Sequence, residues 1–204
     1  MVLTKHPDTG GRNLGTYRMQ VFDARTTGMH MQIQKGGGFH HGVAEARGQA
    51  LPVCVVLGGD PVLMLASIAP LPEDIDELAF AAYLRGVPLP VREARSVPHL
   101  VPASAEFILE GEVRPRERRW EGPFGDHFGH YSHAADFPVF HLTRMTHRRD
   151  AIYPASVVGQ PPQEDRWIGD ALQELMVPLA RMIHPEVADL WAFFEAGFHN
   201  LLSI

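Results

Sequence analysis

The chain has 204 residues and a formal net charge of −6, with 18 lysines and arginines against 24 acidic residues. Scattered basic residues under a negative net charge argue against a nucleic-acid partner or an anionic membrane surface, because neither would attract the chain electrostatically. The apolar runs are too short to cross a bilayer, so we expect no membrane span. This length predicts one large domain, or one domain with a small appendage.

The start of the chain predicts a β-hairpin. Residues 12–22 and 29–35 alternate apolar and polar side chains, and the turn DARTTG separates them. A glycine-rich break follows, and we expect a short helix near 42–48. The continuous apolar run LPVCVVLGG at 51–59 then predicts a buried strand.

The buried strand contains Cys54, the only cysteine. A single cysteine excludes an internal disulfide and is typical of a reducing compartment, so we predict a cytoplasmic location. No signal-peptide pattern opens the chain, which agrees with that prediction. An apolar strand raises the pKa of a thiol, which makes Cys54 a poor candidate nucleophile.

Helices and then strands are predicted in the rest of the chain. Residues 60–72 and 73–86 predict two helices, the second amphipathic and ended by Gly86. Residues 164–185 predict a long helix with Pro178 near its middle. Short strands are expected at 87–95, 105–113, 137–146 and 151–158. Strands with interspersed helices and no βαβ alternation favour an α+β fold, an antiparallel barrel or sheet with helical insertions.

The last residues, VADLWAFFEAGFHNLLSI, are apolar and stop abruptly. The segment FHNLLSI is typical of the beginning of a strand. We therefore expect a piece of a longer protein, or a subunit whose partner chain supplies the rest.

The segment EGPFGDHFGHY carries the clearest sign of chemistry. It holds Glu121 and Asp126 on either side of a Gly-Pro-Phe-Gly turn, where a core needs neither acid. An arginine beside two carboxylates forms a proton-transfer unit, because the guanidinium holds one acid ionised while the other exchanges a proton. Arg18 is a candidate for that arginine, although its sequence-only interpretation is a surface strand residue.

Other charged residues have simpler interpretations. Glu77 on the amphipathic helix is typical of a solvated helix face, and Glu106 and Glu110 are typical of exposed charges on a strand. Asparagine and glutamate oxygens suit a hard cation such as Mg²⁺ or Mn²⁺. A zinc site formed by His127, His130 and His133 is an alternative. It is a weak one, because a spacing of three without cysteines is not the pattern of a structural zinc site.

Five motifs in order resemble the UbiD-type decarboxylases, which use prenylated FMN to decarboxylate aromatic and α,β-unsaturated acids reversibly. They are NLGTYRMQVFDARTTGMHMQIQKGG, VLGGDPVLMLASIAPLPEDIDELAFAAYLRG, VPASAEFILEG, EGPFGDHFGHY and THRRDAIYPASVVGQPPQED. The resemblance covers nearly the whole chain and corresponds to the central domain of a longer protein. It implies a split β-barrel of the flavin-reductase-like type at 1–165, and a helix with the start of a truncated carboxy-terminal domain at 166–204.

The resemblance also implies a role for each site residue. Asn13, Gln34 and Glu77 match the ligands of the divalent cation, Mn²⁺ or Mg²⁺, that bridges the flavin phosphate. Many relatives have a histidine where this chain has Gln34, which should weaken the site. His30 shares a strand face with Gln34 and could replace it only if the backbone shifts.

The remaining matches concern catalysis and flavin binding. The catalytic set is Arg18, its carboxylate partner Glu121 and the proton donor Asp126. Thr16 and Tyr17 match backbone contacts to the flavin. The segment around the flavin phosphate and a monovalent cation such as K⁺ matches Ser67, Ile68, Ala69 and Pro70. The expected partners are a small acid substrate, a flavin prenyltransferase that supplies the cofactor, a chain with the carboxy-terminal domain, and further copies in a homo-oligomer. A flavin-binding module that needs a partner domain for catalysis is the alternative function.

Overall fold

The computed structural model describes residues 1–32, 34–72, 75–159, 163–196 and 202–203. The chain divides into two compact units. The first consists of Met1–Glu121 and Ala135–Pro154, and the second of Gly122–Ala134 and Ala155–Ile204. The predicted domains, 1–165 and 166–204, stay a prediction. No helix in the described residues is long and apolar enough to span a membrane.

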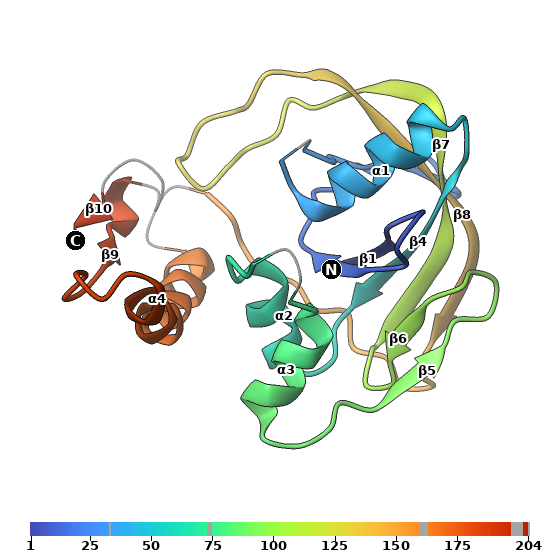
Figure 1. Cartoon of the computed structure of the whole chain (residues 1–204). Helices are drawn as coiled ribbons and strands as arrows, with labels where there is room; N and C mark the ends of the chain where they lie inside the picture. Colours follow the sequence, from blue (N-terminus) through green and yellow to red (C-terminus); the bar gives the residue numbers. More distant parts are fainter. Residues whose placement is uncertain (33, 73–74, 160–162, 197–201, 204) are drawn as a thin grey trace. The chain divides into compact units, whose positions relative to one another are not determined.

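One antiparallel sheet of six strands forms the centre of the first unit, in the order β2-β1-β4-β7-β8-β3. Figure 1 labels β1, β4, β7 and β8 of this sheet. Its strands are β1 Val2–Lys5, β2 Arg12–Gly15, β3 Thr26–Gly28, β4 Leu51–Leu57, β7 Phe107–Glu121 and β8 Ala135–His147. The predicted mixture of helices with an antiparallel sheet is confirmed. The flavin-reductase-like split barrel is not confirmed, because in the described residues the edge strands β2 and β3 do not pair and the sheet stays open.

Three helices and a small hairpin complete the first unit. The helix α1 Gly36–Ala46 packs on β1, β2, β4 and β7, while α2 Pro61–Ile68 and α3 Glu77–Arg85 pack on each other and on β2. A separate pair, β5 Val91–Glu93 and β6 Leu100–Pro102, forms the hairpin. The second unit contains α4 Glu164–Ile183, β9 Trp191–Ala192, the short 3₁₀ helix Phe194–Ala196 and β10 Leu202–Ser203.

The elements with strong local signals are predicted correctly. β4 is the predicted buried strand, and Val53, Cys54 and Val56 are fully buried in it. The helix α3 begins where the Asp76 side chain accepts a hydrogen bond from Leu78 N at 2.9 Å. It ends at Gly86, whose φ of 70° is the left-handed conformation that glycine adopts most easily.

The predicted hairpin of 12–22 with 29–35 is wrong in its second half. β2 ends at Gly15 and pairs with β1. The chain after it does run beside β3, since Gly28 N donates to Gln20 O at 2.7 Å and His30 N donates to Arg18 O at 2.9 Å. Beyond His30 the backbone turns, and α1 starts at Gly36 rather than near residue 42.

One other expectation is wrong, and one strand was not predicted. Residues 151–158, all within the described part of the chain, form no strand, and β1 at Val2–Lys5 was missed because its first residues gave too short a pattern. The end of the chain was expected to begin a strand. Most of FHNLLSI lies outside the described residues, but β10 covers two of its positions.

Candidate functional site

Arg18 and Glu121 form an ion pair within the first unit. Arg18 Nε donates to Glu121 Oε1 at 3.0 Å. The Glu121 side chain is fully buried at the end of β7, and its Oε2 has no hydrogen-bond partner in the described residues. Burial raises the pKa of Glu121, while the hydrogen bond and the positive charge of Arg18 act to lower it. A buried carboxyl with one unpartnered oxygen is suited to exchange a proton or to meet a polar ligand.

His30 is the third member of this cluster. Its Nδ1 lies 2.8 Å from an Arg18 terminal nitrogen and 3.6 Å from Glu121 Oε1. Its ring packs against Phe137 of β8, with centroids 4.1 Å apart. The chain turns directly after His30, so the strand alternation that placed His30 and Gln34 on one face does not hold. His30 belongs to the Arg18–Glu121 pair, a role that sequence reasoning missed.

Gly28 makes room for the buried carboxyl. A Cβ at this position would overlap Glu121 Oε2 and lie 3.3 Å from the ring of Phe22. Gly28→Ala is therefore expected to lower the free energy of unfolding by about 1–3 kcal/mol, because overpacking displaces a buried group. Urea denaturation measures this change from the shift in midpoint.

Gly42→Ala is the matched control for Gly28→Ala. Gly42 lies in α1, and a Cβ there meets no atom within 4 Å. The same substitution should stabilise the chain by up to about 1 kcal/mol, because alanine favours a helix interior. Equal effects at the two glycines would contradict the packing of Glu121 against Gly28.

A second cluster surrounds Asn13, on β2. Its Nδ2 donates to Glu77 Oε1 at 2.7 Å, and Leu14 N donates to Glu77 Oε2 at 3.0 Å. Tyr17 Oη donates to Asn13 Oδ1 at 3.0 Å and accepts from Gly37 N at 2.8 Å. Burial raises the pKa of Glu77, although the hydrogen bonds from Leu14 and Asn13 act to lower it. Glu77 is thus part of a network, not the solvated helix charge that its sequence suggested.

The donors of this cluster suit a hard cation. Carboxylate and amide oxygens are the ligands that Mg²⁺ and Mn²⁺ prefer. The side-chain nitrogen of Asn13 donates to Glu77 in this structure. A cation between the two side chains would need the amide oxygen in that place, so the amide group of Asn13 would have to flip. Gln34 is exposed in the turn before α1, and no hydrogen bond joins it to Asn13 or Glu77 in the described part of the chain.

The zinc alternative gains no support. The described residues include His127, His130 and His133, yet they contain no group of three His, Cys, Asp or Glu side chains that could hold a metal ion.

The predicted flavin contacts lie at the end of α2 and after β2. Thr16 Oγ1 and Ser67 Oγ lie 2.9 Å apart, and Ser67 Oγ also donates to Met64 O at 2.9 Å. Ser67 is buried, Ile68 and Ala69 are half-buried, and Pro70 is exposed. This contact brings the loop after β2 to the end of α2, so two segments far apart in sequence share one surface.

Asp126 belongs to the second unit, in the excursion Gly122–Ala134 between β7 and β8. An isolated bridge pairs Gly125 with Tyr131. Asp126 Oδ1 accepts from Phe128 N at 2.8 Å, and Asp126 N donates to His130 O at 2.9 Å. The acid therefore lies on a small hairpin with its side chain partly committed to the local turn.

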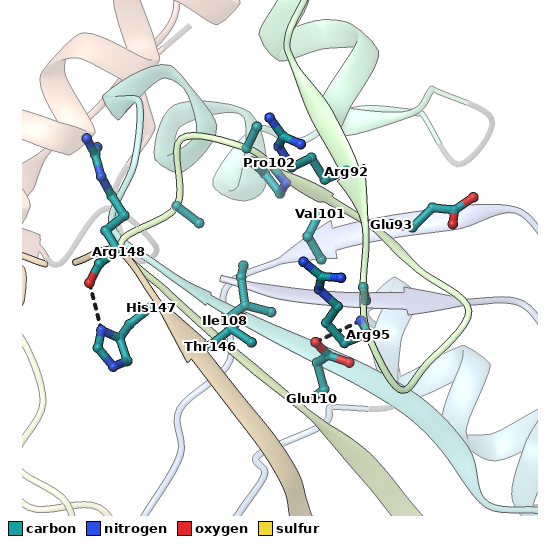
Figure 2. A pocket seen from close by; sticks show the side chains of 13 residues that line it. Arg92, Glu93, Arg95, Val101, Pro102, Ile108, Glu110, Thr146, His147 and Arg148 are labelled. Atoms are coloured by element: carbon teal, nitrogen blue, oxygen red, sulfur yellow. Dashed lines mark hydrogen bonds between the residues drawn. The ribbon is translucent and has the colours of Figure 1, made fainter.

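A separate cavity lies between the β5–β6 hairpin and the ends of β7 and β8 (Figure 2). Its volume is about 260 Å³, and none of the predicted site residues lines it. Glu110 is one of its lining residues and accepts hydrogen bonds from Arg95 N at 3.0 Å and Ser96 Oγ at 2.6 Å. Glu110 is 1% exposed, so its interpretation as an exposed strand charge is wrong. Burial acts to raise its pKa, but these hydrogen bonds outweigh burial and lower it.

Known proteins resemble this chain in sequence. An uncharacterized protein of Archaeoglobus fulgidus is 51% identical over 205 residues, covering 100% of this chain and 43% of that protein. A Chlamydia pneumoniae protein, named as one of the subunits of a 4-hydroxybenzoate decarboxylase, is 51% identical over 203 residues, covering 100% of this chain and 35% of its own length. The chain thus spans less than half the length of each of these two relatives.

Solved structures of two enzymes are also similar to this chain. The UbiD-class enzyme HmfF of Pelotomaculum thermopropionicum, in complex with FMN, matches with a TM-score of 0.85 and 30% identity, over 97% of this chain and 44% of that one. Vanillic acid decarboxylase of Sedimentibacter hydroxybenzoicus, in its closed form, matches with a TM-score of 0.88 and 30% identity, over 94% and 42%.

A family model supplies the assignment. The 3-octaprenyl-4-hydroxybenzoate carboxy-lyase Rift-related domain of the UbiD family matches residues 1–161, most of the chain. The chain therefore belongs to the UbiD family of carboxy-lyases.

Proposed function

We propose that this chain is the flavin-binding and catalytic module of a UbiD-type decarboxylase. Its reaction would be the reversible, non-oxidative decarboxylation of an aromatic or α,β-unsaturated acid with prenylated FMN. The observation that carries the proposal is the Arg18–Glu121 pair, in which a fully buried carboxyl keeps one oxygen without a partner in the described residues. HmfF structures with FMN and with prenylated FMN support the choice of cofactor.

Two groups of residues would hold the cofactor. Asn13 and Glu77, with Gln34 after a shift of its turn, would bind the Mn²⁺ or Mg²⁺ that neutralises the phosphate. The flavin would contact the loop after β2 and the end of α2, and K⁺ would bind beside the phosphate; the residues are Thr16, Tyr17, Ser67, Ile68, Ala69 and Pro70. When bound, prenylated FMN supplies the electron sink for the loss of carbon dioxide.

The chain's own residues would orient the acid and move the proton. Arg18 would remain ionised and hold Glu121 in place through their charge-assisted hydrogen bond. Asp126, protonated, would deliver its proton to the carbon that carried the carboxylate, and solvent would reprotonate it. In the carboxylation direction Asp126 would accept that proton.

A flavin-binding module that needs a partner domain is the second candidate. The name of the Chlamydia pneumoniae protein, which describes it as a decarboxylase subunit, favours it. In this case a partner chain would supply the carboxy-terminal domain. Assembly into a homo-oligomer, a flavin prenyltransferase as supplier and a cytoplasmic location stay predictions in both cases.

Co-expression with a flavin prenyltransferase tests the proposal. The purified chain should show a flavin absorption spectrum, and mass spectrometry of the released cofactor should give prenylated FMN at near one equivalent. Turnover of aromatic acids by this preparation would support the first candidate. Bound flavin with turnover only after the carboxy-terminal domain is added would support the second, and an empty chain in both cases would refute both.

Glu77→Gln is expected to weaken flavin binding by roughly tenfold. A neutral amide is a poorer ligand for the cation than a carboxylate, and the hydrogen bond from Asn13 to Glu77 is weakened as well. The amide keeps the shape of the side chain and an acceptor for Leu14 N. Fluorescence titration of the chain with FMN and Mn²⁺ measures the change in Kd.

The control for Glu77→Gln makes the same substitution away from the site. Glu112→Gln removes an exposed carboxylate that pairs with Arg114 at 2.9 Å. Its Kd for FMN should match that of the wild type. If Glu77→Gln also leaves Kd and its Mn²⁺ dependence unchanged, the metal role is refuted.

A further inference from the structure

The protonation state of His30 follows from its contact with Arg18. An arginine guanidinium carries five N–H donors, no acceptor, and stays charged in proteins. The 2.8 Å contact between an Arg18 terminal nitrogen and His30 Nδ1 is therefore a hydrogen bond that Nδ1 accepts. The ring must then be neutral and carry its proton on Nε2.

The surroundings of His30 hold the ring in this state. Burial, followed by the positive charges of Arg18 and Lys35, lowers the pKa of His30. The backbone fixes the residue opposite Arg18, because His30 N donates to Arg18 O at 2.9 Å. Phe137 packs against one side of the ring, with centroids 4.1 Å apart.

We propose that His30 is a positioning residue for the Arg18–Glu121 pair, acting as an Nε2–H imidazole whose Nδ1 accepts a second hydrogen bond from Arg18. Its consequence for turnover rests on the proposed decarboxylase function. The hydrogen bond to Glu121 holds the Nε side of the guanidinium, and the hydrogen bond to His30 holds one of its terminal nitrogens. Hydrogen bonds at two different nitrogens restrict the plane of the guanidinium, and such fixed geometry is what orients a reacting group.

The same contact argues against His30 as the missing metal ligand. Its Nδ1 is engaged by Arg18, and a cation at this nitrogen would lie beside the guanidinium charge. The residues with suitable oxygen donors, Asn13 and Glu77, form their own network around Tyr17. His30 therefore belongs to a different hydrogen-bond network from the candidate cation site.

NMR of the cofactor-free chain tests the tautomer without any assumption about function. Long-range ¹H–¹⁵N spectra of ¹⁵N-histidine chain at pH 7 should assign His30 as neutral with the proton on Nε2. A ring protonated at Nδ1, alone or together with Nε2, cannot accept from Arg18 and would overturn the proposal.

A pair of substitutions then separates positioning from simple packing. His30→Leu removes the acceptor and keeps an apolar body against Phe137, whereas His30→Asn places an amide oxygen near the position of Nδ1. The pKa of the Glu121 carboxyl, followed by ¹³C NMR, should rise in His30→Leu because Arg18 is less firmly held. It should return toward the wild-type value in His30→Asn. Equal values in all three chains would overturn the proposal.

Kinetics of the flavin-loaded chain add the functional readout. In His30→Leu, kcat should fall by roughly 10- to 100-fold while KM changes little, the pattern of a misplaced catalytic group. His30→Asn should restore most of kcat. A tautomer and carboxyl pKa that match expectation, in a wild-type chain that shows no turnover alone or with the carboxy-terminal domain added, would refute the decarboxylase function and leave the positioning of Arg18 by His30 intact.

Discussion

Asp126→Asn is expected to abolish turnover while the flavin stays bound. Asparagine has nearly the shape of aspartate but has no acidic proton to give to the carbon that loses carbon dioxide. Removal of a general acid costs roughly 10²- to 10⁴-fold in rate. The comparison needs kcat of the loaded chain and the molar ratio of flavin to protein, measured on the same preparation.

The local structure makes Asp126→Asn a clean substitution. Asp126 Oδ1 accepts from Phe128 N, and an asparagine oxygen can accept the same hydrogen bond. The backbone hydrogen bonds to His130 and Gly129 do not involve the side chain. The hairpin at Gly122–Ala134 should therefore persist, and a loss of rate would report the missing proton.

Asp136→Asn provides the matched control. Asp136 is exposed on β8, opposite Trp120 in the β7–β8 ladder. The same chemical change there should leave both kcat and flavin content at wild-type levels. If Asp126→Asn turns over at the wild-type rate, another group delivers the proton and the assignment fails.

The sequence predicts best the elements whose signals are local. The buried strand β4 shows its apolar run within a few residues, and α3 shows both a capping aspartate and a terminating glycine. The ends of the β7–β8 ladder were harder to predict, because β7 continues through RPRERRW, where charged side chains mask the strand pattern. Register shifts between Val113 and Arg118 break the alternation further, and the pairing with β8 is visible only in three dimensions.

The candidate site divides in the same way. Arg18 and Glu121 are 103 positions apart, so no local pattern could place them together, and the family resemblance supplied the pair. The structure brings them into contact, while their catalytic roles stay predictions. The prediction that His30 and Gln34 share a strand face is wrong for a physical reason. An extended strand to residue 35 was assumed, but the chain turns after His30 and Gln34 leaves the strand face.

Arg18→Leu is the substitution with the largest expected effect on stability. It removes the cation that faces a fully buried carboxyl, so Glu121 loses its charge-assisted hydrogen bond. Removing one partner of a buried ion pair lowers the free energy of unfolding by about 3 kcal/mol or more. We expect a loss of about 3 kcal/mol, the lower end of this range, because the Arg18 side chain is 27% exposed. Urea denaturation at pH 8 measures the loss, and Arg114→Leu, which breaks an exposed pair, should cost less than about 1 kcal/mol.

The pH dependence of this loss identifies Glu121 as its source. The pKa of Glu121 is raised in the folded chain, so the folded state binds this proton more tightly than the unfolded state. Its contribution to stability is present below the unfolded pKa and is lost as pH rises through the folded pKa. Without Arg18 the folded pKa rises further, and the deficit of Arg18→Leu should be smaller at pH 5 than at pH 8. Glu121→Gln in the same chain should remove this pH dependence, whereas a deficit independent of pH in both chains would show that lost packing, not the buried charge, destabilises the variant.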